Sequence, residues 1–234
     1  MHAISRRAAD AAIPVPAYLS QTYWWAYVHP RAVRLFERQW LVNLILWGNF
    51  GRLCDAALGA LGERLTGRTL QIACVYGDLT ARLAARVDGR SRLDVVDVLQ
   101  IQLDNLARKL PRSAAVRLVH GDSAALELES GSYDRALLFF LLHEQPVAAR
   151  RATLAEALRV VKPGGRLVIV DYHRPRACNL LYLPMVLMLR TLEPYALDLW
   201  RQEVAAWLPR DAAVASLEKE TLFGGLYQIL TLTR

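Results

Sequence analysis

Side chains that can bind a ligand or transfer a proton recur in this sequence directly after short apolar runs. They are Tyr76, Gly77 and Asp78 after TLQIACV, Asp97 at the end of RLDVVDV, Asp122 and Ser123 after VRLVH, His143 and Glu144 after RALLFFLL, and Asp171, Tyr172 and His173 at the end of RLVIVDY. Carboxylates gathered at one place repel one another unless a ligand or a metal ion separates their charges. The pattern therefore predicts a ligand site wherever these five runs end together.

The five apolar runs alternate with amphipathic segments, which predicts how they are arranged. The runs cover 69–75, 92–98, 116–120, 135–142 and 166–172, and helical patterns cover 80–87, 100–110 and 148–161. Alternation at this spacing is typical of a parallel sheet with crossover helices. Ligands of such sheets bind beyond the carboxyl ends of the strands, so we expect the polar residues named above to meet at that edge.

Two further patterns complete the expected fold. KPGGR at 162–166 predicts a helix end and a turn, with Pro163 ending the helix and positive φ at Gly164 and Gly165. The tail at 213–234 contains two strand patterns around a Gly-Gly turn, which would add an antiparallel pair to the sheet. We expect one domain. A helical cover would span 1–65 and an α/β unit 66–234, with a helical insertion at 177–208.

The composition narrows the class of protein and its partners. The chain is 54% apolar and 22% charged, as a folded globular protein would be, and its net charge is +7. Arginines supply most of the positive charge, but no dense basic run with interleaved aromatics is present, which weighs against nucleic acid as a partner. The three cysteines lack metal-binding spacing and the first residues lack an apolar signal region. We therefore expect a cytoplasmic protein with reduced thiols.

Two apolar segments, 40–50 and 179–189, are flanked by arginines and are too short to span a bilayer. They fit two interpretations, a buried helix or a helix that lies on a membrane or covers an apolar ligand. The amino-terminal region is also rich in aromatic side chains. These are Trp24, Trp25, Tyr27, Trp40 and Trp47.

From residue 66 to 234 the sequence resembles the class I methyltransferases that use S-adenosylmethionine (SAM). LQIACVYGD lies where the family has a strand and a glycine-rich turn, Asp97 matches its ribose-binding acid, and Asp122 in HGDSAAL matches the residue at the adenine amino group. KPGGRL is the commonest hallmark of the family, and the GxGxxG of an unrelated dinucleotide fold is absent. The resemblance implies a Rossmann-like, mostly parallel seven-stranded sheet. It implies SAM contacts from Gln71, Ala73, Val75, Tyr76, Gly77, Asp97, Val98, Asp122 and Ser123.

The departures from that family are concentrated in the turn after the first strand. Gln71 stands where typical members have an acidic residue, and Val75 and Tyr76 occupy glycine-region positions. The whole chain, including VYGD and EPYALDLW at 193–200, resembles the rhodoquinone biosynthesis protein (RquA) family. This resemblance implies that a ubiquinone methoxy group is replaced by an amino group. SAM would be the nitrogen source and co-substrate, with a divalent metal ion, manganese being the one expected.

A nucleophilic amine must be neutral, and Gln71 removes a charge that would raise the pKa of the amine. The candidate catalytic residues are Tyr76, Asp78 and His143. The candidate metal ligands are Asp78, Asp122, His143, Asp171 and His173. Other roles stay open at this stage: Tyr76 could fill space over the adenosine, Asp78 could cap the next helix, and both histidines could be structural.

The implied substrate carries a polyprenyl tail, so the protein is expected to work at the inner face of a membrane as a peripheral protein. Two other functions remain open. One is ordinary methyl transfer from SAM to a quinone or another lipid, and the other is a non-catalytic SAM-binding or lipid-binding accessory role. The sequence determines neither the oligomeric state nor the catalytic base.

Overall fold

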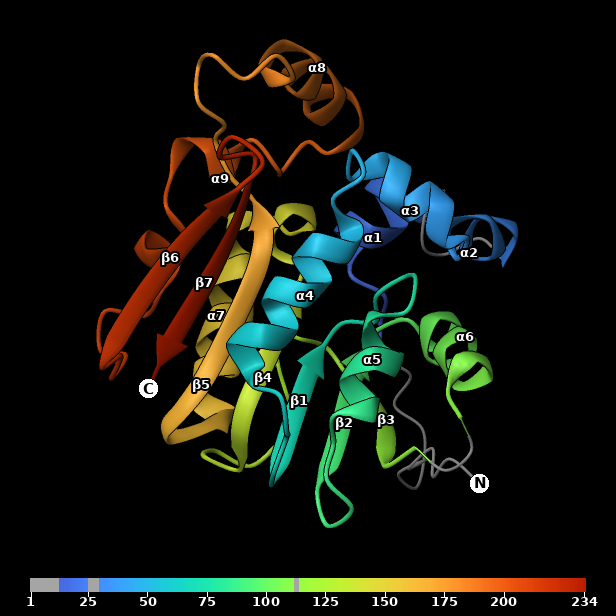
Figure 1. Cartoon of the computed structure of the whole chain (residues 1–234), viewed down its shortest axis with the longest axis vertical. Coiled ribbons are helices and arrows are strands. Elements are labelled where there is room, and N and C mark those ends of the chain that lie inside the picture. Colours follow the sequence, from blue (N-terminus) through green and yellow to red (C-terminus); the bar gives the residue numbers. More distant parts are fainter. Residues whose placement is uncertain (1–12, 25–29, 112–113) are drawn as a thin grey trace.

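A seven-stranded sheet forms the centre of the computed structural model, which describes residues 13–24, 30–111 and 114–234 (Figure 1). The strand order is β3-β2-β1-β4-β5-β7-β6. The first five strands are parallel, and β7 runs antiparallel to both β5 and β6. The strands are β1 (Arg68–Ile72), β2 (Arg92–Asp97), β3 (Val116–His120), β4 (Tyr133–Phe139), β5 (Val161–Tyr172), β6 (Ser216–Leu222) and β7 (Tyr227–Thr233). The predicted α/β fold with an antiparallel carboxyl-terminal hairpin is confirmed.

Helices cover both faces of this sheet. At β4 and β5, α4 lies on one face and α7 on the other (Figure 1). The helices are α1 (Ala17–Thr22), α2 (Pro30–Phe36), α3 (Gln39–Ile45), α4 (Phe50–Leu61), α5 (Leu79–Ala85), α6 (Gln100–Lys109), α7 (Val147–Val160), α8 (Tyr182–Leu192) and α9 (Asp198–Arg201). Short 3-10 turns lie at Leu142–Glu144 and Val204–Trp207. Because the central strands are covered on both faces, their sequences are almost continuously apolar.

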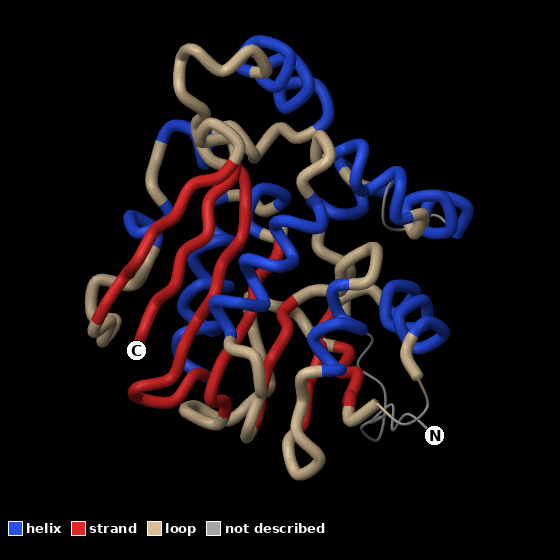
Figure 2. Tube along the Cα trace, viewed as in Figure 1, coloured by secondary structure: helices blue, strands red, loops and turns tan. Residues whose placement is uncertain are grey.

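Two groups of helices stand beyond the carboxyl ends of the strands. Figure 2 shows α1 to α3 and α8 beyond that edge of the sheet. We expected the amino-terminal region to be helical throughout. In the described part of it, short breaks separate α2 from α3 and α3 from α4. The 177–208 region contains α8, α9 and one 3-10 turn. Trp25 and Tyr27 of the expected aromatic cover lie outside the described residues.

Some predicted boundaries are wrong for local backbone reasons. The first strand ends at Ile72 and not at 75, because Ala73 takes the left-handed φ of 72°. The fourth ends at Phe139, before Phe140 with a φ of 53°. The predicted turn at 162–166 belongs to β5.

Only one of the two glycines in KPGGR has the positive φ that we expected for both. Gly164 has a φ of 75°, whereas Gly165 is required by a close approach. A Cβ at Gly165 would lie 2.8 Å from the Asp134 carbonyl oxygen and 2.7 Å from Val161 Cγ1. The second glycine therefore allows β4 and β5 to pack.

Candidate active site at the carboxyl edge of the sheet

Asp97 ends β2 and joins two of the loops at this edge. Its side chain accepts hydrogen bonds from the backbone N–H groups of Cys74 at 2.7 Å and Leu99 at 2.8 Å, one to each oxygen. Burial raises the pKa of Asp97, and the two backbone donors act in the opposite direction. The Cys74 thiol also donates to this carboxylate. Since a carboxylate offers about four acceptor sites, Asp97 can still accept a hydrogen bond from a ligand hydroxyl group.

The turn after β1 is strained at Ala73 and is supported by Gln71. A left-handed φ at a residue with a Cβ is unfavourable by about 1–2 kcal/mol. The Gln71 amide donates from Nε2 to the Ala73 carbonyl oxygen at 3.0 Å, and the Ala73 N–H donates to the Val96 carbonyl at 2.8 Å. Gln71 is fully buried, and within the described residues its Oε1 has no hydrogen-bond partner. The turn therefore contains one buried neutral acceptor that a ligand can use.

Three side chains hold the next part of the turn, and we call them the Glu37 clamp: Glu37, Asn105 and Lys109. Glu37 accepts hydrogen bonds from Lys109 Nζ and Asn105 Nδ2, both at 2.5 Å, and from the Gly77 N–H at 3.3 Å. Lys109 also donates to the Gly77 carbonyl at 3.0 Å. A Cβ at Gly77 would lie 2.7 Å from Phe50 Cζ, so only glycine fits there. The clamp joins the end of α2 to α6 across the turn.

Tyr76 faces α6 and the amino-terminal helices. Its hydroxyl accepts a hydrogen bond from Gln102 Nε2 at 2.8 Å, and its ring stacks on Phe36 with the centroids 6.0 Å apart. Burial raises the pKa of Tyr76, and the bond from Gln102 only partly opposes this. A phenol with a raised pKa is a poor base near neutral pH, so the geometry favours orientation and packing over proton abstraction.

The carboxyl ends of β4 and β5 bring His143 and Asp171 together. His143 Nδ1 lies 3.0 Å from Asp171 Oδ1, while Asp171 Oδ2 accepts the backbone N–H groups of Leu142 and His143. Burial lowers the pKa of His143, but Asp171, with Glu193 and Glu144, outweighs burial and raises it to about 9. The ring is therefore protonated at neutral pH and suits proton donation.

Glu193 reaches this pair from the segment after α8. His143 Nε2 lies 3.9 Å from Glu193 Oε2 and 3.7 Å from Glu144 Oε1. Burial raises the pKa of Glu193, and the charge of His143 opposes that rise. Arg150, which is fully buried, holds the segment by donating to the Tyr195 carbonyl at 2.9 Å. Glu193 was not among the predicted site residues, although an acid within the mostly apolar region 179–200 was a visible signal.

The loop after β3 and helix α1 form the remaining side of the site. Asp122 accepts a hydrogen bond from the Ala124 N–H at 2.8 Å, and Ser123 Oγ lies 2.9 Å from Thr153 Oγ1. Val98 packs in a small apolar cluster with Leu19 of α1. The amino-terminal helix thus covers the edge between the predicted ribose and adenine residues.

The five predicted metal ligands do not form one site. Across the described residues, no group of three or more His, Cys, Asp or Glu side chains is placed to hold a metal ion. The donor atoms of Asp171 are occupied as described above. His173 Nδ1 lies 2.8 Å from the Gly225 carbonyl, and its Nε2 lies 3.3 Å from Lys219 Nζ, which is a poor setting for a cation. These residues do not fit the implied metal.

The Asp78 side chain does not cap the helix that follows it. It occupies the N-cap position of α5, but its side chain makes no capping hydrogen bond. Its Oδ1 is buried and, among the described residues, has no hydrogen-bond partner. The capping interpretation is therefore wrong, and a carboxylate oxygen beside the turn is left available.

Comparison with known proteins identifies the family. Residues 69–165 match the methyltransferase-domain family. Over 188 residues the chain is 31% identical to demethylmenaquinone methyltransferase from Beutenbergia cavernae, and the match covers 75% of this chain and 74% of that protein. The chain belongs to the class I SAM-dependent methyltransferase family.

Solved structures show the same fold at lower identity. An O-methyltransferase family protein from Burkholderia thailandensis has a TM-score of 0.62 at 18% identity, covering 82% of this chain and 58% of that one. Phosphoethanolamine N-methyltransferase 2 from Haemonchus contortus, in complex with SAM, has a TM-score of 0.60 at 14% identity. That match covers 94% of this chain and 60% of that one. The buried Asp97 and the unpaired Gln71 oxygen fit SAM as the ligand of this edge.

Proposed function

We propose that this chain uses SAM to modify a polyprenyl quinone, replacing a methoxy group of ubiquinone with an amino group to give rhodoquinone. The relationship to demethylmenaquinone methyltransferase supports a quinone as the substrate. The site residues support SAM at the carboxyl edge, with Asp97 accepting the ribose hydroxyls. The presence of Gln71, Val75 and Tyr76 where typical members have an acid and a glycine-rich turn supports the amino end of SAM as the reacting group.

Gln71 is the observation that carries the amino-transfer proposal. Typical members hold the SAM ammonium with a carboxylate at this position. Here the side chain is neutral, fully buried and hydrogen-bonded to the Ala73 carbonyl oxygen. A nearby negative charge raises the pKa of an amine, so its absence favours the neutral amine that can attack a ring carbon.

The atoms balance without another oxidant or reductant when the product that leaves the enzyme is the reduced form, rhodoquinol, which gives rhodoquinone on later oxidation. The SAM nitrogen bonds to the ring carbon, methoxide leaves as methanol with an amine proton, and loss of the α-proton moves two electrons into the ring. Water then releases a keto acid and leaves the amino group on the reduced ring. In this scheme His143, protonated and held by Asp171, donates a proton to the quinone oxygen, and Asp78 is the candidate base. No step is assigned to a metal ion, because the five predicted ligands, all within the described part of the chain, do not form a site for one.

We also propose peripheral association with the inner face of the membrane, where the polyprenyl tail resides. No helix in the described ranges combines the length and apolar character needed to cross a bilayer. The exposed leucines of α8, Leu183 and Leu187, support attachment of the protein to one face of the membrane.

Mass spectrometry with SAM labelled with nitrogen-15 at the amino group tests the reaction. Purified protein is incubated with labelled SAM and a short-chain ubiquinone analogue. We expect an aminoquinone that retains the label, and no matching formation of S-adenosylhomocysteine. An unlabelled product would refute SAM as the nitrogen donor.

Ordinary methyl transfer to a quinone is the second candidate, favoured by the 31% identity to a demethylmenaquinone methyltransferase. In that case the same incubation with a demethylated quinone would give S-adenosylhomocysteine and a methylated ring. Absence of turnover with both quinones would instead favour a non-catalytic role.

A further inference from the structure

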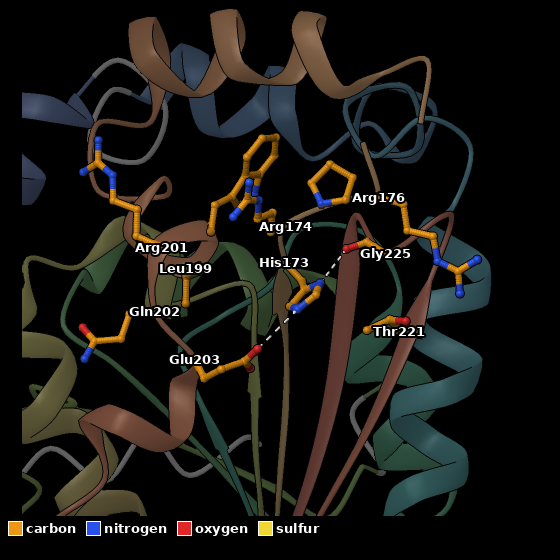
Figure 3. A pocket seen from close by; sticks show the side chains of 11 residues that line it. His173, Arg174, Arg176, Leu199, Arg201, Gln202, Glu203, Thr221 and Gly225 are labelled. Carbon is orange, nitrogen blue, oxygen red and sulfur yellow. Dashed lines mark hydrogen bonds and ion pairs between the residues drawn. The ribbon is translucent and has the colours of Figure 1, made fainter. Parts of the chain in front are cut away.

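A cavity of about 410 Å³ lies between the end of β5, α9 and the β6–β7 hairpin. Figure 3 shows Arg174 near the centre of the lining residues, with Arg201 and Arg176 farther out on either side. The cavity is lined by His173, Arg174, Pro175, Arg176, Leu199, Trp200, Arg201, Gln202, Glu203, Thr221 and Gly225. No residue of the proposed SAM site belongs to this set.

The charges of this cavity favour an anion. Arg174 and Arg176 are exposed, and among the described residues no side-chain hydrogen bond or ion pair is found for either. The carboxylate of Glu203 is matched by Lys219 Nζ at 2.7 Å, so it does not neutralise the arginines. Arg201 Nη1 forms an ion pair with Asp198 Oδ1 at 3.4 Å, so this arginine is already paired with a carboxylate. Guanidinium groups that are not paired with carboxylates are well suited to phosphate oxygens.

Helix α8 passes above this basic cavity (Figure 3). The helix carries apolar side chains on two of its sides. Its inner side buries Met185 and Leu189. On the outer side of α8, Leu183 and Leu187 are 76% and 68% exposed, and Leu180, in the turn before the helix, is 93% exposed. The spacing of four residues places Leu183 and Leu187 on one face of the helix. A soluble protein rarely exposes leucines grouped in this way unless they contact a membrane, a ligand or another protein.

Helix α3 extends the same surface. Trp47, just after α3, donates from Nε1 to Met185 Sδ at 3.2 Å and so fixes the two apolar segments side by side. Trp40 and Leu44 on α3 are exposed. The leucines and tryptophan form an apolar face next to the unpaired arginines, which is the arrangement of a helix lying in a lipid interface.

We propose that an anionic bilayer covers this face and that the cavity beside Arg174 and Arg176 receives a phospholipid headgroup phosphate. The outer leucines of α8 would enter the interface while the arginines contact phosphates. This inference deepens the membrane association proposed above and rests on it. Glu193 directly follows α8, so docking here would bring the bilayer next to the region around His143, where a polyprenyl quinone could enter from the lipid.

Vesicle co-sedimentation tests the headgroup site directly. The full chain is mixed with vesicles of phosphatidylcholine alone or with phosphatidylglycerol added. We expect binding to the anionic vesicles that weakens with salt. The variant R174Q/R176Q should bind them about 25-fold more weakly, at about 5-fold for each arginine near the surface. The control R90Q/R108Q removes two exposed arginines elsewhere and should bind like wild type.

Further arms separate the possible outcomes. L183Q/L187Q should lose vesicle binding while still binding inorganic phosphate as wild type does, because the cavity is intact. Equal binding of wild type and R174Q/R176Q to anionic vesicles would overturn the headgroup site alone. A further outcome is that the wild-type protein binds inorganic phosphate but neither type of vesicle. That result would overturn both the membrane association and the headgroup site, and would indicate a site for free phosphate. None of these measurements needs SAM or a quinone, so failure of amino transfer would leave them unaffected.

Discussion

Gln71 combines a structural and an electrostatic role in one buried side chain. It donates to the carbonyl of Ala73, a residue in the left-handed region, and so helps to hold the turn that follows β1. At the same time it places a neutral group where the family has a carboxylate. Both roles follow from the amide, since an acid could not donate to that carbonyl unless it were protonated.

Gln71→Glu should lower amination and move its pH optimum to more alkaline values. A nearby carboxylate raises an amine pKa by about 1 unit or more, and each unit lowers the free amine about tenfold at fixed pH. The measurement is a pH–rate profile. Gln71→Leu, which loses the hydrogen bond without adding charge, is the control and should keep the wild-type optimum. A Glu variant with the same optimum as the Leu variant would show that this position does not tune the nucleophile.

Asp97→Ala should weaken SAM binding by about 1.5–3 kcal/mol, the range for a hydrogen bond to a charged group. The carboxylate also accepts two backbone N–H groups of neighbouring loops, so part of the loss will come from a less ordered turn. Titration calorimetry measures the affinity, and thermal unfolding reports whether the fold survives. Asp104→Ala on the exposed side of α6 is the control. An unchanged SAM dissociation constant for the Asp97 variant would remove it from the ribose site.

Among the elements, α2 and α6 are joined by the Glu37 clamp across the turn that is proposed to hold SAM. The side chains of Glu37 and Lys109 are both about one-fifth exposed, at 21% and 22%. Such a pair is shielded from water more than a surface ion pair is. Breaking it therefore lowers the free energy of unfolding more than breaking a surface pair does. The clamp therefore couples the position of the amino-terminal cover to the shape of the turn.

Glu37→Gln should destabilise the protein by about 1–3 kcal/mol in urea unfolding, because Lys109 loses its carboxylate partner while partly shielded from water. Glu63→Gln is a matched control. Glu63 lies 3.8 Å from Arg86 with its side chain 89% exposed, and its loss should change stability by less than about 0.5 kcal/mol. Equal effects of the two substitutions would show that the clamp contributes no more than a surface pair.

For the whole molecule, the buried group around His143 links stability to pH. The pKa of His143 is raised to about 9, so its proton is bound more tightly in the folded than in the unfolded state. That contribution is fully present below about pH 6.5 and is lost as the pH rises through about 9. Glu144, Glu193 and Asp171 face the ring and maintain the shift.

The free energy of unfolding should therefore fall between pH 6.5 and 9, by up to about 3 kcal/mol from this group. Urea unfolding at several pH values measures the slope. His143→Gln can still donate to Asp171 but cannot titrate, so its curve should be flatter over the same range. If the His143→Gln variant keeps the wild-type change of unfolding free energy with pH, groups other than His143 cause that change.

The order of strands and helices was readable from the sequence because it depends on local periodicity. Runs such as 92–98 and 116–120 are apolar over the length of a strand, and 100–110 has the spacing of a helix. The parallel order in turn placed Asp97 and Asp122 at one edge, since carboxyl ends of parallel strands share an edge. The motifs then indicated the SAM family, which the comparisons confirm.

The tertiary structure alone decided which side chains meet. Glu37 and Lys109 are 72 residues apart, and His143 and Asp171 are 28 apart, so no local pattern pairs them. The five predicted metal ligands lie at one edge of the sheet but do not converge on one metal ion. The direction of each side chain and its hydrogen-bond partners depend on residues that are distant in sequence. Whether α8 is buried or exposed was likewise undecidable from its composition, since its leucines are spread around the helix. Only the packing of Met185 and Leu189 inward left Leu183 and Leu187 outside.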